Sequence, residues 1–244
     1  MTITVFVLGC ILTLLSYCCG TTRATTTASS KEETGGLDFD RCGFTALDHA
    51  TADLVFFGNG PLAPISEEEL VDECVRLRAS LRSTKRYANN CTMGLGQVML
   101  KMFVEAARKE LEYRCDGKGK EEYLKLTPCL VEKSGPALHK CNVRYSGYLQ
   151  AITEQNKTDR IPFACCYHAK FERCVTNVAK KCGEEHAKFS AKIVASMSEE
   201  LNDTVCRKWV RNPSLCRSLP KVIPVKSPRY MTMLPNLMSI LDTI

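Results

Sequence analysis

Apolar residues recur along this chain mostly with the period of an α-helix. Behind Ser66-Glu67-Glu68-Glu69, the apolar positions Leu70, Cys74, Leu77 and Leu81 follow the spacing i, i+4, i+7, i+11. Ser66 and Glu69 form a capping box, in which the hydroxyl accepts a free amide N–H and the carboxylate reaches back to the cap residue. The pattern therefore predicts a helix that begins directly after Ser66.

Five further stretches show the same period. They predict helices at about 93–113 and 121–132, from Gly135-Pro136 onward, from Ile161-Pro162 to Gly183, and at about 184–201. Pro128 is expected to bend or interrupt the second of these, because proline removes a backbone donor inside a helix. No comparable run alternates with the period of two that indicates a strand. The predicted fold class is all-α: a disulfide-linked bundle of about five to seven helices, with a proline-rich basic C-terminal tail.

The first 20 residues predict a signal peptide. They hold no charged side chain and contain an apolar run from Ile3 to Leu15. This run is too short for a comfortable membrane span and lies where the hydrophobic part of a secretory signal belongs. Cleavage is expected after Gly20, with cleavage after Ala24 as the alternative. Residues 21–41 are polar and predict a flexible leader, 42–216 a cysteine-rich helical domain, and 217–244 a tail.

The cysteines change the picture from a generic helical protein to a secreted one. Of 15 cysteines among 244 residues, three lie in the predicted signal peptide. An even dozen then indicates six disulfides formed in an oxidising compartment, with the pairing left open. No C-x-x-C pair occurs and histidine is scarce, so neither a zinc site nor any other cofactor is expected. The twelve are Cys42, Cys74, Cys91, Cys115, Cys129, Cys141, Cys165, Cys166, Cys174, Cys182, Cys206 and Cys216.

Three sequons agree with secretion. Asn156 and Asn202 each begin an Asn-x-Thr triplet. Asn90 begins a third, which is a poorer acceptor because Cys91 occupies its middle position. N-linked glycans are therefore predicted at these asparagines.

The net charge of +6 is unevenly distributed. From Asp203 to the end there are seven basic and two acidic residues, whereas the body before it is nearly balanced. Five of the ten prolines lie in this segment, so it is expected to be extended until Leu234, Leu237, Met238 and Leu241 form a short helical apolar stripe. Two interpretations follow. The tail contacts a polyanion or an anionic lipid surface through Arg217, Lys221, Lys226 and Arg229, or it docks on the helical body. No nucleic-acid partner is expected.

Catalytic templates find little support. Cys165-Cys166-Tyr167-His168, with Cys174 beyond, resembles the active-site helix of secreted phospholipases A2. The histidine comes one position early, however, and Ala169 stands where that family places a calcium-binding aspartate. One residue turns a helical side chain by about 100°, so a divergent hydrolase is the minor alternative. Nucleophile-elbow, zinc-protease, P-loop and dinucleotide-binding signatures are absent from the sequence. We expect a protein that is not an enzyme.

A family resemblance covers roughly residues 125–210. The stretch from Phe163 to Cys174, with its doubled Cys165-Cys166, and its continuation to Cys182 resemble the cysteine-rich core of the arthropod 27 kDa haemolymph glycoproteins. The resemblance implies a secreted, helical, disulfide-linked extracellular protein and carries over no catalytic residue. The predicted function is non-enzymatic binding of an extracellular protein, with carriage of an apolar small molecule or lipid inside the bundle as the alternative.

Overall fold

The computed structural model describes residues 42–242. The predicted signal peptide and the flexible leader lie outside these residues. The described chain is dominated by α-helices and contains no strand, so the all-α prediction is confirmed. Its six longest helices agree with the predicted number. They are α3 (Glu67–Asn90), α4 (Gly94–Cys115), α5 (Gly119–Cys129), α6 (Gly135–Thr153), α7 (Lys157–Ala179) and α8 (Glu184–Asp203).

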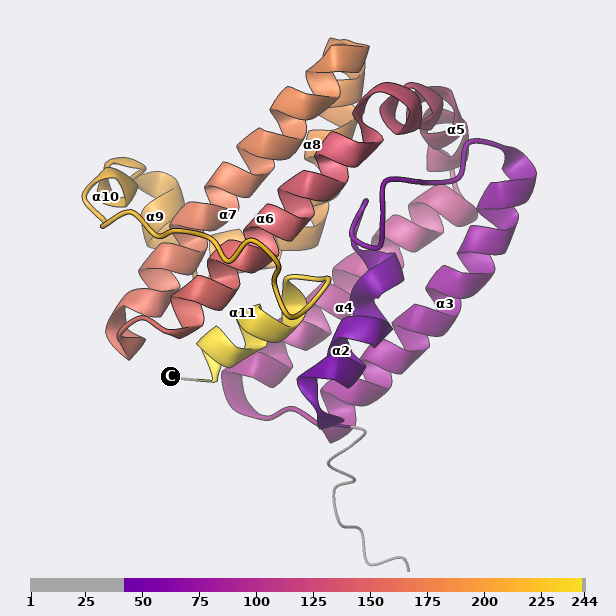
Figure 1. The fold of residues 1–244 in the computed structure, drawn as a ribbon. Helices are drawn as coiled ribbons and strands as arrows, with labels where there is room; N and C mark the ends of the chain where they lie inside the picture. Colours follow the sequence, from indigo (N-terminus) through magenta and orange to yellow (C-terminus); the bar gives the residue numbers. More distant parts are fainter. Residues whose placement is uncertain (1–41, 243–244) are drawn as a thin grey trace, which may run out of the picture. The chain divides into compact units, whose positions relative to one another are not determined.

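The long helices pack as sequential neighbours (Figure 1). Helices α3 and α4 form one hairpin, α6 and α7 form another, and α8 packs against both α7 and α4. The short helix α2 (Phe44–Thr51) lies against α3. A core cluster that includes Leu138, Leu149 and Ile152 fills the α5–α8 part, and a second that includes Leu47, Leu100 and Met238 lies where α2 and α4 meet the C-terminal helix α11 (Leu234–Leu241).

Helix α3, the first of the predicted helices, begins directly after Ser66 as expected. Ser66 Oγ accepts the N–H of Glu69 at 3.2 Å. The Glu69 carboxylate accepts the N–H of Ile65 at 2.9 Å, one residue before the cap that the capping box predicts. Both bonds satisfy backbone groups at the start of α3, where amide donors lack partners within the helix.

Two prolines lie inside helices. Pro128 is the last residue but one of α5, and a π-helical segment, Leu130–Ser134, follows and leads directly into α6. The helix is thus interrupted near Pro128 by a change of helix type. The prediction that the next helix begins at Ile161 was wrong by about one turn, because α7 begins at Lys157 and contains Pro162. A proline so close to a helix start removes one intrahelical hydrogen bond and leaves the rest of the helix intact. At the other end, a 3₁₀ turn, Lys180–Cys182, leads to Gly183, whose φ of +114° favours glycine.

All twelve predicted cysteines form disulfides. Cysteines of α7 and of the turn after it reach several neighbours, as their eight-residue spacing predicts. Their partners lie in α5, in α6, and around the short helices α9 (Arg207–Arg211) and α10 (Ser214–Arg217). The six pairs are Cys42–Cys91, Cys74–Cys115, Cys129–Cys182, Cys141–Cys174, Cys165–Cys206 and Cys166–Cys216. Across the part of the chain that the structure describes, no helix has both the length and the apolarity to cross a membrane.

The C-terminal tail packs on the helical body. Residues 218–233, which we call the strap, run without helix across α7 and α6 and lead into α11 (Figure 1, yellow). The Tyr167 hydroxyl bonds both the N–H and the C=O of Val222, and the Val225 N–H donates to the Gly147 carbonyl at 3.1 Å. Of the predicted apolar stripe, Leu234, Met238 and Leu241 are fully buried. Docking is thus the interpretation that the structure favours for the apolar stripe.

A buried carboxylate holds the end of the strap. Asp48 of α2 is 5% exposed, and its two oxygens accept the N–H groups of Met231 and Thr232, each at 2.8 Å. The Ser146 hydroxyl of α6 reaches the Tyr230 and Thr232 carbonyls at 3.0 and 3.1 Å. A buried charged acceptor with two donors is a strong fixed contact, so these bonds define the path of the chain into α11.

Candidate functional site

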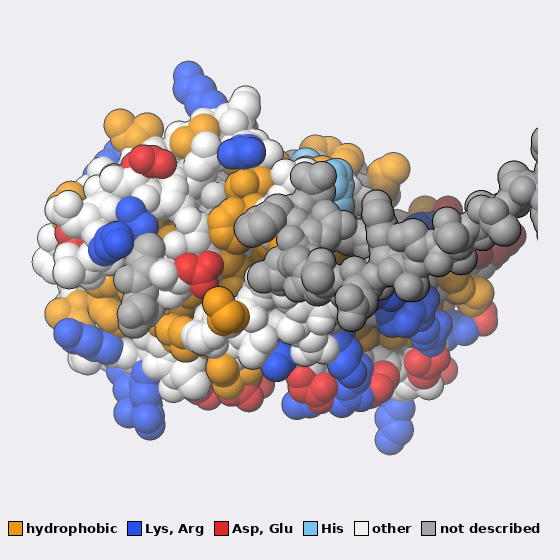
Figure 2. All heavy atoms as spheres, turned by 90° about the horizontal axis from the view of Figure 1, so that it is seen from below, with side chains coloured by type: hydrophobic (Ala, Val, Ile, Leu, Met, Phe, Trp, Pro, Cys, Tyr) orange, Lys and Arg blue, Asp and Glu red, His pale blue; other side chains and the backbone are white. Residues whose placement is uncertain are grey.

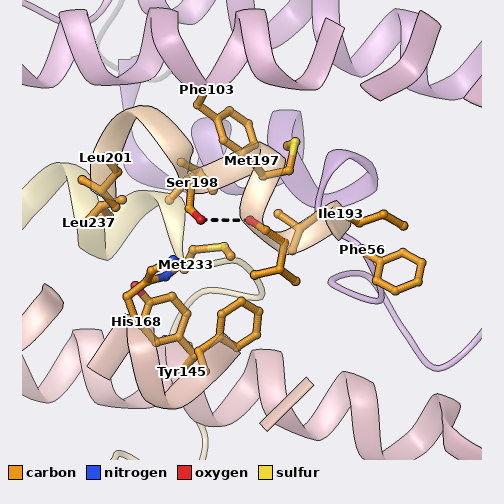
Figure 3. A pocket seen from close by; sticks show the side chains of 14 residues that line it. Phe56, Phe103, Tyr145, His168, Ile193, Met197, Ser198, Leu201, Met233 and Leu237 are labelled. Atoms are coloured by element: carbon orange, nitrogen blue, oxygen red, sulfur yellow. Dashed lines mark hydrogen bonds between the residues drawn. The ribbon is translucent and has the colours of Figure 1, made fainter. Parts of the chain in front are cut away.

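An apolar cavity lies where six segments of the chain converge (Figure 3). Its volume is about 70 Å³. Side chains of α4, α6, α7, α8 and α11 line it, together with the loop at residues 55–56. Tyr145 and His168 form one wall, and Phe103 and Met197 lie across from them (Figure 3). Because apolar surfaces line most of it, the cavity favours an apolar occupant over water.

The aromatic wall is rigid. The Tyr145 and Phe171 rings stack at 4.8 Å between centroids with an interplanar angle of 11°, and the His168 ring lies 5.7 Å from Tyr145. Helices α6 and α7, which supply these residues, are joined by the Cys141–Cys174 disulfide. Burial strongly raises the pKa of the Tyr145 phenol, so this hydroxyl is neutral at physiological pH.

One corner of the cavity is polar. His168 is 5% exposed, and its Nε2 lies 3.2 Å from Glu172 Oε1. This contact lowers the pKa of the Glu172 carboxyl, which also accepts from Asn202 Nδ2 at 3.3 Å. Ser198 Oγ donates to the Val194 carbonyl at 2.9 Å. A ligand whose body occupies the apolar space would therefore place a hydrogen-bonding group near His168.

A second, smaller space adjoins the first. It measures about 50 Å³ and shares five lining residues with the cavity, from α4, α8 and α11. Among the five, Met197 has a long, unbranched and adaptable side chain. The shared residues are Phe103, Met197, Leu201, Leu234 and Leu237.

The hydrolase alternative, which stays a prediction, depends on the surroundings of His168. His168 faces the aromatic wall and Glu172, and within residues 42–242 no hydrogen bond joins it to Ser198. Cys129, Cys182 and His186 have potential ligand atoms within 4.8 Å of one another. The two sulfurs form a disulfide, however, so they offer no thiolate to a metal.

The structure places the other predicted residues away from this cavity. Arg217, Lys221, Lys226 and Arg229 are all exposed, the first in α10 and the others on the strap. Asn90 and Asn156 are exposed at helix ends, and Asn156 makes no side-chain capping bond. Asn202 is half-buried, and its amide contacts Glu172 and Ser198. Of the three asparagines, Asn202 is the least accessible in the folded chain.

The cavity residues were not singled out by the sequence as a group. Tyr145, Ile193, Val194 and Met197 stand at positions of a helical apolar period, which is typical of any core. No sequence pattern indicates Phe103, Ser198 or Met233 as part of a binding site. A cavity is space left over after helices pack, and periodicity reports which side of a helix faces inward without reporting how well the facing surfaces fit.

Comparison with other proteins gives no further guide. The chain matches no protein-family model, no curated protein and no solved structure. The resemblance to haemolymph glycoproteins therefore stays a prediction, and the function has to be argued from the site.

Proposed function

We propose that this protein is a secreted, non-enzymatic binding protein that holds a small, mostly apolar molecule with one hydrogen-bonding group. The observation that carries the proposal is the apolar cavity with the buried His168 in its wall, where the ring Nε2 lies 3.2 Å from Glu172 Oε1 and this pair forms the polar corner of an otherwise apolar lining. Binding pockets are mostly apolar and use a few polar groups to orient the ligand, so the His168–Glu172 corner favours a ligand that carries one hydrogen-bonding group.

The size of the cavity limits the ligand. Pockets for drug-sized molecules measure roughly 300–1,000 Å³, whereas an apolar cavity of about 150 Å³ accepts benzene. The two adjoining spaces here measure about 70 and 50 Å³. Because the two spaces together are smaller than the cavity that accepts benzene, a molecule of that size fits only if lining side chains such as Met197 move, whereas a long acyl chain would require α11 to leave its position. The size of the cavity therefore favours a small apolar molecule over a lipid as the ligand.

Secretion is part of the same proposal. Six disulfides among the described residues are typical of an extracellular protein. The predicted signal peptide and sequons, and the resemblance to haemolymph glycoproteins, support an extracellular fluid as its location.

Thermal unfolding with benzene and phenol tests the ligand class. Phenol adds one hydroxyl to the same ring, so it should stabilise the protein more than benzene does. At ten times its dissociation constant, phenol should add about 1.4 kcal/mol, which is a rise of roughly 4 °C in melting temperature for a chain of this size.

Two variants locate the effect. Leu201→Phe fills the shared wall of the two spaces and should abolish the shift, whereas Leu215→Phe, outside the cavity, should retain it. His168→Phe should remove the preference for phenol while benzene still binds. Equal phenol shifts in the wild type and in Leu201→Phe would refute the proposal.

A further inference from the structure

A second surface of the protein differs from the apolar cavity because basic side chains line it. A groove of about 460 Å³ lies between α6 and α7 on their outer side. Arg144, Lys170 and Arg173 line it, and no acidic residue does. None of these three cations forms an ion pair with any residue that the structure describes. The groove is thus a concave surface of one charge sign.

Helix packing fixes the three cations opposite one another. The Cys141–Cys174 disulfide brings the Cα atoms of antiparallel α6 and α7 to 5.9 Å, and the Tyr148 and Tyr167 rings meet at 4.2 Å two turns away. In this register, Arg144 on α6 lies across from Lys170 and Arg173 on α7. Lys170 Nζ lies 3.8 Å from the Tyr167 ring centroid, and an Arg144 guanidinium nitrogen donates to the Tyr148 hydroxyl at 3.1 Å. Aromatic contacts thus hold two of the cations without neutralising them.

The docked strap extends this surface. Val222 bonds to the Tyr167 hydroxyl at the end of the groove, so the preceding residue, Lys221, stands beside it. Val225 then pairs with Gly147, and the Arg229 N–H donates to Gln150 Oε1 at 2.7 Å, which carries Lys226 and Arg229 across α6. The three strap cations are exposed and also form no ion pair with described residues. The tail and the groove together make one strip of unpaired positive charge.

The rest of the surface contrasts with this strip. On the face seen from below, basic side chains stand among acidic ones (Figure 2). The ion pairs between surface helices, such as Arg78–Asp116 and Lys125–Glu185, involve α3, α5 and α8. Unpaired charge of one sign concentrated on one face attracts polyanions, and released counterions favour the complex.

From this geometry we infer that the strip formed by Arg144, Lys170, Arg173, Lys221, Lys226 and Arg229 binds a linear sulfated glycan. A chain of sulfates can enter the groove and follow the strap, whereas a flat membrane meets a concave surface poorly. The most exposed apolar side chain of the strap is Ile223, and one isoleucine buries too little apolar surface to anchor a protein on a membrane. This inference is independent of the cavity and its ligand.

Heparin affinity of the full chain tests the inference. The groove variant Arg144→Gln/Lys170→Gln/Arg173→Gln should elute at clearly lower NaCl than the wild type. Its plot of log affinity against log salt should be shallower by about two to three units, since each of the three lost ion pairs removes about 0.7–0.9 of a released counterion. The strap variant Lys221→Gln/Lys226→Gln/Arg229→Gln should show a loss of similar size.

A matched control loses the same charge elsewhere. Lys101→Gln/Lys109→Gln/Lys192→Gln changes three cations in the groove between α4 and α8, where glutamates also line the surface. Its heparin elution should stay close to that of the wild type. Equal elution of the groove variant and this control would overturn the inference, because binding would then depend on net charge alone.

Vesicles with about one third phosphatidylserine form the second probe. If the groove substitutions release the protein from vesicles but leave heparin elution unchanged, the strip is a membrane site and the inference fails.

Discussion

Two surface grooves of nearly equal size differ in how their charges are arranged. The α4–α8 groove measures about 480 Å³ and the α6–α7 groove about 460 Å³. The first is lined by Lys101, Lys109 and Lys192 together with four glutamates, and the second by cations alone. In the first, charges of opposite sign compensate one another within the protein. In the second, no acidic side chain lines the groove, so anions from solution or from a partner have to balance its positive charge. The two grooves therefore differ in the arrangement of charge and not in volume, and only the second is a candidate binding surface.

The two grooves also differ in what builds them. The α4–α8 groove takes its charges from two helices whose sequences already contain both signs. The α6–α7 groove gains its neighbouring cations from the strap, which is distant in sequence and held by a few buried polar contacts. Changes to those contacts should therefore affect one groove and spare the other.

The largest effect is expected at Asp48. Asp48→Asn replaces one of two acceptor oxygens by an amide that faces a backbone N–H, so a buried donor loses its partner. We expect the free energy of unfolding to fall by about 3 kcal/mol, since hydrogen bonds to charged groups are worth roughly 1.5–3 kcal/mol each. Denaturant titration with intact disulfides measures this loss, and heparin affinity should fall with it as the strap loosens. Asp53→Asn, whose carboxylate bonds Asn59 and Ser80 near the surface, is the control and should change both quantities little.

A smaller effect is expected where the strap crosses α6. A Cβ atom at Gly147 would lie well inside van der Waals contact with the Val225 carbonyl oxygen, so the strap must move to accommodate it. Gly147→Ala should lower the free energy of unfolding by about 1–3 kcal/mol, despite the better helix propensity of alanine. Gly60→Ala meets no atom within 4 Å and serves as the control. If Gly147→Ala unfolded at the same denaturant concentration as the wild type, the close crossing of the strap over α6 would be wrong.

The smallest effect concerns the α4–α8 groove. Burial raises the pKa of the Glu110 carboxyl above its ordinary 4.5, against the nearby charges of Arg114 and Lys192. A raised pKa in the folded state means that ionised Glu110 destabilises the fold at neutral pH, and that this penalty disappears as the pH falls below the ordinary value. Glu110→Gln should therefore raise the melting temperature at neutral pH by at most about 2 °C and leave it unchanged in acid.

The matched variant for this measurement is Glu112→Gln. Glu112 is exposed and paired with Arg108, so the same loss of charge should give no gain in melting temperature. Heparin elution should be the same for both variants. A gain for Glu112→Gln equal to that for Glu110→Gln would show that net charge, and not burial, produces the effect.

Sequence patterns predicted most of the helices because each reports a local property. The capping residue Ser66, the apolar period behind it and the left-handed glycine Gly183 act within one or two turns, and the structure has all three where they were expected. The misplaced start of α7 has a local reason too, since a proline within the second helical turn costs less than the pattern assumed. The short helices α2, α9 and α10 escaped prediction because each is too short to show a full apolar period.

The candidate sites were much less accessible to sequence reasoning. The cavity needs Tyr145, His168 and Met197 to surround a space that their helices leave unfilled, and no periodicity encodes such a misfit. The basic strip needs Arg144 and Arg173 beside Lys221, which lies more than 40 positions farther along the chain. The sequence identified the tail cations as a possible polyanion contact, but it did not indicate that they join a groove.

The sequence alone determined the helical class, the set of twelve paired cysteines and the uneven distribution of charge. The spacing of apolar residues, the even number of cysteines and the charges of each segment can all be counted along a chain. Tertiary structure decided which cysteines pair, where the tail docks and which charges remain without partners. These depend on distances between residues far apart in sequence, and such distances arise only when the apolar faces of the helices pack together. Both candidate surfaces, the cavity under α11 and the basic strip over α6 and α7, are consequences of that packing.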